Sequence, residues 1–235
     1  MFLFDDRYET FHMFSLSHGL ALLVLILAIV SLFLLRNRIN NNRSLEKKTR
    51  VFIAILMIIL EWVYYAWVIS RSGFMLSLLP LGLCAISMYM TAIALLTNSE
   101  RIFKILYPWA VTGALLSLLV ADMTFEFPHF RFFHYFGNHS LFLFGNLYLI
   151  FVSGYRIKYK DILKSSFILL CLAIPIYFIN PILDTNHMFL RELPNEVSFL
   201  FGWMGDPWWV FGFSFGIFFL FHLLYLPFLF SEKKA

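Results

Sequence analysis

Seven apolar stretches, each about twenty residues long, fill most of this sequence. They cover about 14–35, 51–70, 74–97, 102–122, 132–154, 162–183 and 208–230. A helix needs roughly 20 mostly apolar residues to cross a hydrocarbon core about 30 Å thick. Seven such stretches in a chain of 235 residues leave little room for a water-soluble domain. We therefore predict a single transmembrane domain that occupies residues 1–235.

Composition and periodicity favour helices in these stretches. Hydrophobic residues make up 61% of the chain and charged residues 14%, whereas soluble domains carry about 25% charged residues. Strands in lipid would have to form a closed barrel with alternating polarity, and these stretches do not alternate. The predicted fold class is all-α, a bundle of seven transmembrane helices.

Lysine and arginine are distributed unevenly between the two sides of this bundle. Fourteen of the 18 fall in the odd-numbered connections or the C-terminal tail; the other four are Arg7, Arg71, Arg131 and Arg191. Because basic loops stay in the cytoplasm, we predict a multi-pass protein of the cell membrane with its N-terminus outside and its C-terminus inside. This topology accounts for the net charge of +4, so membrane lipid is the expected partner and nucleic acid is not.

Ionisable side chains inside the spans are few, and they indicate where a function would lie because each is costly to bury. At a rise of about 1.5 Å per residue, Glu61 and Cys84 lie roughly 14 Å below the outer ends of their helices, His139 about 10 Å and His18 about 6 Å. Because all four residues lie in the outer half of the membrane, we predict a polar cavity there. Further candidate ligand-binding residues near the outer helix ends are His134, Asp122 and Asp206.

Three expectations follow for the local structure. The third span should be kinked or unwound near Pro80 and Gly82, because proline frees a backbone carbonyl and bends a helix; this would present Cys84 to the cavity. Glu61 and His139 should pair directly or through one water. The connection at about 184–207 mixes apolar and polar residues and should contain a helical turn, either as a lid over the outer helix ends or as an interfacial aromatic anchor.

Metal and cofactor chemistry are not predicted. His134 and His139 are five residues apart, about 140° around a helix, rather than at the i, i+4 spacing of metal-binding pairs. The two cysteines, Cys84 and Cys171, both fall inside predicted spans and show no metal-type spacing.

At these residues the chain resembles the YwaF-type bacterial integral membrane proteins over nearly its whole length, which implies a compact bundle of six or seven helices. The matching segments are Leu79–Cys84, Gly113–Leu119, Phe127–His134, Asn186–Arg191 and Leu224–Phe228.

The chain is also distantly similar to a eukaryotic family of transmembrane acyltransferases that remodel ether phospholipids. The shared features are Glu61, Pro80, the run Gly113–Leu116, His139 and the dipeptide Asp206-Pro207. That resemblance implies a Cys-His dipeptide directly after the proline, whose cysteine accepts the acyl group. Here these positions are Leu81 and Gly82, and the histidine that YwaF-type proteins keep at the second position is absent too.

Three functions stay open on this basis. The first is a cavity that binds a lipid or other small amphiphile without catalysis, which the glycine at position 82 favours. The second is a phospholipid acyl hydrolase or acyltransferase with Cys84 as nucleophile, His139 as base and Glu61 as an orienting acid. The third is a subunit of a transporter.

Overall fold

The computed structural model describes residues 2–4 and 10–232, and in this part the chain is built from helices alone, apart from one isolated bridge between Thr10 and Phe125. The all-α class is thereby confirmed. The α-helices are α1 (Leu16–Asn40), α2 (Arg43–Ser72), α3 (Leu83–Thr97), α4 (Glu100–Leu119), α5 (Phe130–Phe151), α6 (Tyr159–Leu183), α7 (Asn195–Phe201) and α8 (Trp208–Glu232). Short 3-10 helices occupy Phe2–Phe4 (η1), Leu76–Leu78 (η2), His187–Phe189 (η3) and Gly202–Met204 (η4).

Five of the described helices are long and apolar enough to cross a membrane: α1, α2, α4, α6 and α8. Helix α3 is apolar but has only 15 residues. Helix α5 has 22 residues, but its polar residues keep its hydropathy below that of the five. Helices α1 to α6 and α8 follow the order of the seven predicted spans, while a count of seven membrane crossings stays a prediction.

The third predicted span differs most from the structure. A helix was expected over 74–97, but α3 begins only at Leu83. Pro80 cannot donate a backbone hydrogen bond and holds Leu79 before it in an extended conformation, with ψ 134°. Gly82 is extended as well, with ψ 146°, and precedes the first turn of α3. The expected unwinding near Pro80 and Gly82 is confirmed, and the expected helix before it is wrong.

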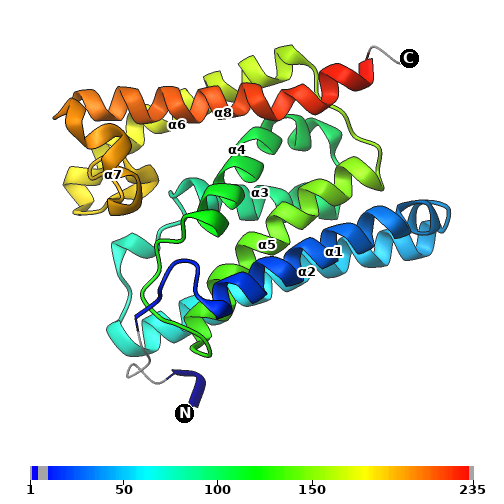
Figure 1. Cartoon of the computed structure of the whole chain (residues 1–235), viewed down its shortest axis with the longest axis horizontal. Coiled ribbons are helices and arrows are strands. Elements are labelled where there is room, and N and C mark those ends of the chain that lie inside the picture. The colour runs from blue at the N-terminus through cyan, green and yellow to red at the C-terminus, as the bar shows by residue number, and fades with distance from the viewer. Residues whose placement is uncertain (1, 5–9, 233–235) are drawn as a thin grey trace.

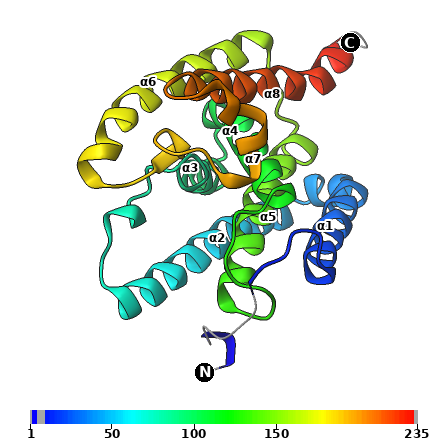
Figure 2. The ribbon, with the colours of Figure 1, turned by 60° about the vertical axis from the view of Figure 1, so that its left-hand side comes forward.

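Helix α4 lies at the centre of the bundle. It contacts α3, α5, α6 and α8, and Phe103, Leu106, Ala110 and Ala114 on it are completely buried. In Figure 2, α3 is seen nearly end-on, with α6 and α8 above it and α2 below it. Helix α1 packs on α5 and α2 at the side of the bundle.

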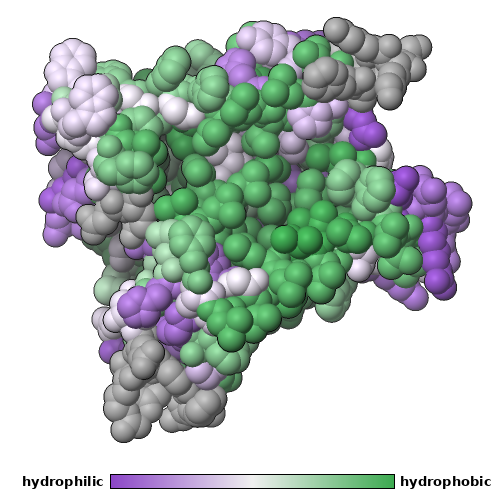
Figure 3. Space-filling view, viewed as in Figure 1, coloured by the Kyte–Doolittle hydropathy of each residue, from purple (hydrophilic) through white to green (hydrophobic). Residues whose placement is uncertain are grey.

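The helix ends form two groups, as Figure 1 shows. The α4–α5 connection, α7 and the start of α8 lie at the left; the α1–α2 and α5–α6 connections and the far end of α8 lie at the right. In Figure 3, apolar side chains cover the middle of this face, and hydrophilic residues gather toward its left and right ends. This distribution is the one expected of a bundle surrounded by lipid.

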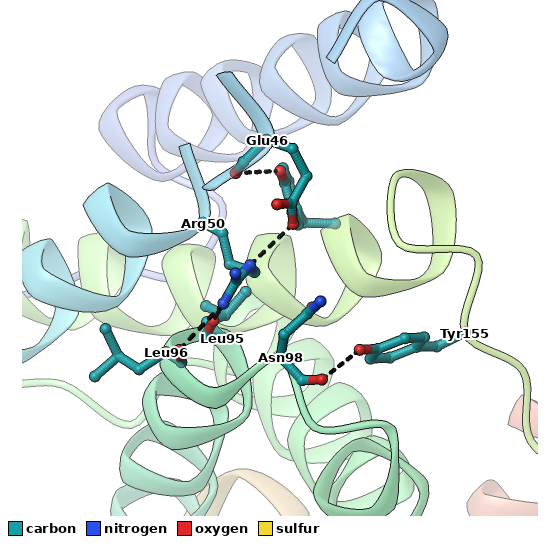
Figure 4. Close-up of polar contacts among 7 residues, drawn as sticks. Glu46, Arg50, Leu95, Leu96, Asn98 and Tyr155 are labelled. Atoms are coloured by element: carbon teal, nitrogen blue, oxygen red, sulfur yellow. Dashed lines mark hydrogen bonds and ion pairs between the residues drawn. The ribbon is translucent and has the colours of Figure 1, made fainter. Parts of the chain in front are cut away.

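Arg50, near the start of α2, joins α2 to α3, and its partner Glu46 joins α2 to α5. Its Nη1 donates to the carbonyl oxygens of Leu95 and Leu96 in the last turn of α3, at 3.2 Å for Leu96, and its Nε donates to Glu46 at 2.9 Å (Figure 4). The Tyr148 hydroxyl of α5 donates to the Glu46 backbone oxygen at 2.9 Å. Carbonyls in the last turn of a helix have no partner within the helix, so Arg50 supplies one from a neighbouring helix.

Glu126 ties the loop after α4 to the start of α1. Its carboxylate accepts from the Ser17 hydroxyl and from the backbone N–H groups of Phe127 at 3.1 Å and His12 at 3.2 Å. Partial burial acts to raise the pKa of Glu126, but these hydrogen bonds outweigh it and hold the pKa below its usual value. The carboxylate is therefore ionised at neutral pH and stabilises this junction.

Candidate functional site

A cavity of about 410 Å³ lies between α3, α4, α5, α6, α8 and the segment 186–190. Its volume is within the range of about 300–1,000 Å³ that is usual for small-molecule sites. A larger groove of about 760 Å³ between α1 and α5 has no ionisable side chain in its walls. Chemistry therefore concentrates in the smaller cavity, whose polar lining includes Cys84, Ser117, Asp122, Arg131, His139 and His187.

Within the described part of the chain, two buried polar atoms of residues that line this cavity have no hydrogen-bond partner. They are Oγ1 of Thr112, a residue 2% exposed, and Nε2 of His187, a residue 7% exposed. Burial lowers the pKa of His187 below its usual value, against the effect of a hydrogen bond to the Leu76 backbone, so the imidazole is neutral at neutral pH. Buried polar groups are normally paired, and these two atoms are exceptions.

Cys84 and His139 line the same cavity from different helices. Cys84 is the second residue of α3, and its Sγ lies 3.6 Å from the Ser117 hydroxyl of α4. Nδ1 of His139 lies 2.8 Å from the Tyr135 carbonyl oxygen; a carbonyl only accepts, so Nδ1 carries the proton and Nε2 keeps a free lone pair. Among the described residues, no hydrogen bond joins this imidazole to Cys84.

Glu61 pairs with residues other than the predicted one. The His134 Nε2 and the Asn138 Nδ2 both donate to Glu61 Oε2, at 2.9 and 2.8 Å. Among the described residues no hydrogen bond joins Glu61 to His139, so the expected direct contact is wrong, while a contact through one water stays a prediction. His134 and Asn138 are four residues apart and share the face of α5 that meets α2, whereas His139 is turned about 100° further around the axis, toward the cavity.

Arg131 connects this buried cluster to the cavity. Its Nη1 lies 2.7 Å from His134 Nδ1. A guanidinium only donates, so His134 Nδ1 accepts, and Nε2 carries the proton donated to Glu61. The Arg131 Cζ lies 4.7 Å from the ring centroid of Tyr64 and 5.4 Å from that of Tyr135. From the sequence, Arg131 was expected only to be a basic loop residue, although its i, i+3 spacing from His134 could have revealed the pair.

His18 and Asp206 lie away from the cavity. His18 is fully buried; its Nδ1 accepts from the Phe14 backbone N–H at 3.0 Å, and its Nε2 donates to the Leu118 carbonyl at 2.8 Å. Both ring nitrogens are thus occupied. Asp206 accepts from Trp209 Nε1 at 2.7 Å at the start of α8. Of the four candidate ligand-binding residues, Asp122 alone lines the cavity. His134 does not line it but contacts Arg131, which does.

The segment after α6 folds against the cavity, as expected of a lid. It contains η3, α7 and η4, so the expected helical turn is confirmed. Asn180, in the last turn of α6, fixes its start: Nδ2 donates to the His187 carbonyl at 3.0 Å, and Oδ1 accepts from the His187 N–H at 2.8 Å. Residues 186–190 then line the cavity.

No group of three or more His, Cys, Asp or Glu side chains in the described part of the chain is placed to hold a metal ion. The chemistry available at the cavity is that of its own side chains: one guanidinium, one carboxylate, two imidazoles, a thiol and hydroxyls. Such a set can bind a polar group by hydrogen bonds and charge, and it includes a nucleophile and a base.

Comparison with known proteins assigns a family. The family model of the TMEM164 family matches residues 13–225, a range that contains all of the cavity-lining residues. No curated protein and no solved structure matches the chain. Together with five long apolar helices, the family match makes this a multi-pass membrane protein. The chain belongs to the TMEM164 family.

Proposed function

We propose that this protein crosses the membrane seven times, with its N-terminus outside, and binds a lipid or other small amphiphile in the cavity below the segment 186–190. One observation carries the proposal: the cavity has the charged side chains of Asp122 and Arg131 in its lining together with apolar walls that include Leu169, Ile217 and Phe218. The two groups of helix ends in Figure 1 and the basic connections at one of them support the topology.

The charged and the apolar lining residues lie at different positions along their helices. Asp122 follows the end of α4, and Arg131 is the second residue of α5. Ile217 and Phe218 lie nine and ten residues after the start of α8, which is about 14–15 Å further along the axis. A headgroup can therefore contact the ionised residues while an acyl chain lies along the apolar walls.

Retained lipid tests this proposal. The protein is purified from cell membranes in a mild detergent, and bound lipid is extracted and quantified by mass spectrometry. Ala173 lines the cavity from α6, whereas its neighbour Ile174 is 51% exposed on the outer surface. We expect Ala173→Trp to reduce the retained lipid at least about ten-fold by filling the cavity, and Ile174→Trp to leave it unchanged. Equal retention by both variants would refute the proposed binding site.

A second candidate function is acyl transfer or acyl hydrolysis. The supporting observation is that Cys84 and the free Nε2 of His139 face the same cavity. In this reaction His139 accepts the thiol proton, the Cys84 thiolate attacks an ester carbonyl, and the proton returns to the departing alcohol. Water or another alcohol then releases the acyl group from the thioester.

Binding is favoured over this reaction because Cys84 has a hydroxyl neighbour, Ser117, and no hydrogen-bonded base among the described residues. A turnover assay with a labelled phospholipid separates the two. Wild-type turnover that is lost in both Cys84→Ser and His139→Gln, with lipid retention intact, would establish the enzyme. We expect no turnover and normal lipid retention in all three proteins.

A further inference from the structure

We propose that Arg131 is the anchor for an anionic group, a phosphate or a carboxylate, at the polar end of the bound amphiphile, and that the buried pair Glu61 and His134 positions it. This inference rests on the proposed function, since it assigns the polar end of the same cavity. It adds a ligand class and three residue roles to that function.

The first argument is that most of the Arg131 guanidinium is free for a ligand. A guanidinium has five N–H donors in a planar fork, and among the described residues a single side-chain hydrogen bond, to His134, uses one of them. No ion pair links Arg131 to a carboxylate within the described ranges. Phosphate and carboxylate are the groups that this fork binds through two parallel hydrogen bonds.

The second argument concerns how Glu61 is connected to Arg131. A glutamate in direct contact with an arginine commonly takes both arms of the fork. Here the imidazole of His134 stands between them, 2.9 Å from Glu61 and 2.7 Å from Arg131. The negative charge of Glu61 therefore compensates the half-buried guanidinium through His134, while the remaining N–H groups stay available at the cavity wall.

The third argument is that Arg131 is held in place before any ligand arrives. Tyr64 and Tyr135 lie on α2 and α5 with ring centroids 4.7 and 5.4 Å from its Cζ, and both contacts are favourable for a cation. The unpartnered Thr112 Oγ1 and His187 Nε2 line the same cavity. A side chain fixed in this way loses little conformational entropy on binding.

Asp122 is the group that opposes an anion, because it lines the same cavity. Asp122 is exposed, so water and salt screen its charge more than that of a buried residue. Arg131 is less exposed than Asp122 and is placed closer to the buried polar cluster. We therefore expect the attraction of Arg131 to exceed the repulsion of Asp122.

Binding of three single-chain amphiphiles with the same acyl chain tests the inference: a lysophosphatidate, the free fatty acid and an uncharged monoacylglycerol. The purified full chain is placed in phosphatidylcholine nanodiscs, and each radiolabelled probe is titrated. We expect the wild type to bind the two anionic probes at least about ten-fold more tightly than the neutral one, a difference of about 1.4 kcal/mol. Arg131→Gln should bring all three to the affinity of the neutral probe.

Three further variants separate anchoring from folding. Glu61→Gln should reduce the ratio of anionic to neutral affinity without equalising the two, because Arg131 remains but is less well positioned. Arg131→Lys should give an intermediate ratio, since a point charge replaces the fork. Arg71→Gln is the matched control: Arg71 donates to the Phe4 carbonyl at 2.6 Å outside the cavity, and its removal should leave the ratio unchanged.

The outcomes distinguish the sources of the anion and the two proposals. A preference for the lysophosphatidate alone assigns a phosphate, and a preference for both assigns the shared anionic chemistry. Displacement of these probes by millimolar inorganic phosphate identifies a free anion instead of a headgroup, which overturns the anchor role. The anchor role is also overturned if Arg131→Gln still binds the anionic probes ten-fold more tightly than the neutral one. If that variant does not fold, the same result in both Arg131→Lys and Glu61→Gln overturns it. Wild-type protein that binds none of the probes refutes the proposed function itself.

Discussion

Replacing Arg50 with methionine should destabilise the bundle by about 3 kcal/mol. Methionine keeps an unbranched apolar stem in place, but it removes the donors to the Leu95 and Leu96 carbonyls. A hydrogen bond to a charged group contributes about 1.5–3 kcal/mol, and two bonds at the low end of this range give about 3 kcal/mol. The low end applies because these carbonyls lie near an end of the bundle, where water can partly replace Arg50.

Other variants divide this effect into parts. Glu46→Gln removes the i, i+4 ion pair with Arg50 and should cost about 0.3–0.5 kcal/mol. Arg50→Lys keeps the charge but loses the fork, so about half of the effect should remain. Lys48→Met is the matched control: Lys48 is an exposed residue of the same helix, and its loss should change stability by less than about 0.5 kcal/mol.

Thermal unfolding in detergent with a thiol-reactive dye measures these differences. Cys84 is partly buried in the bundle and Cys171 is exposed, so a Cys171→Ser background lets the dye report the opening of the core. A change of 1 kcal/mol shifts Tm by about 2–4 °C in a chain of 150–250 residues, so Arg50→Met should lower Tm by about 6–12 °C. A Tm for Arg50→Met equal to that of Glu46→Gln would refute the capping of α3 by Arg50.

Three further predictions concern the topology and the loops. A reporter fused after Ala235 should be active only in the cytoplasm, and activity only outside would invert the proposed topology. Asn180→Leu leaves the backbone of His187 without partners and should free the segment 186–190, so that a thiol reagent modifies Cys84 at least about ten-fold faster; an unchanged rate would show that this segment does not cover the cavity. Glu126 has a lowered pKa in the folded protein, so its stabilising effect is present at neutral pH and is lost as the pH falls below about 4.5. The Tm difference between wild type and Glu126→Gln should therefore shrink in acid, and a difference that stays constant from pH 7 to pH 3.5 would contradict this role.

The sequence by itself determined the class of protein and the order of its helices. Length and apolarity can be read directly along the chain, and the position of a polar residue along its helix follows from a constant rise per residue. The turn between α3 and α4 was also predictable, because Asn98 adopts a left-handed conformation with φ 50° and Ser99 caps α4. The unwinding near Pro80 has a purely local cause as well.

The tertiary structure decided which of the polar residues meet. His134 and His139 are only five residues apart on one helix, yet His134 contacts Glu61 and His139 faces the cavity. The direction of a side chain around the helix axis becomes a contact only when neighbouring helices pack at particular angles, and no local pattern fixes those angles. For the same reason the role of Arg50 emerges only from the fold: it was one basic residue among 18 until packing brought the end of α3 to it. The pair of Arg131 and His134 is local to α5, and only its link to Glu61 depends on the packing of α2 against α5.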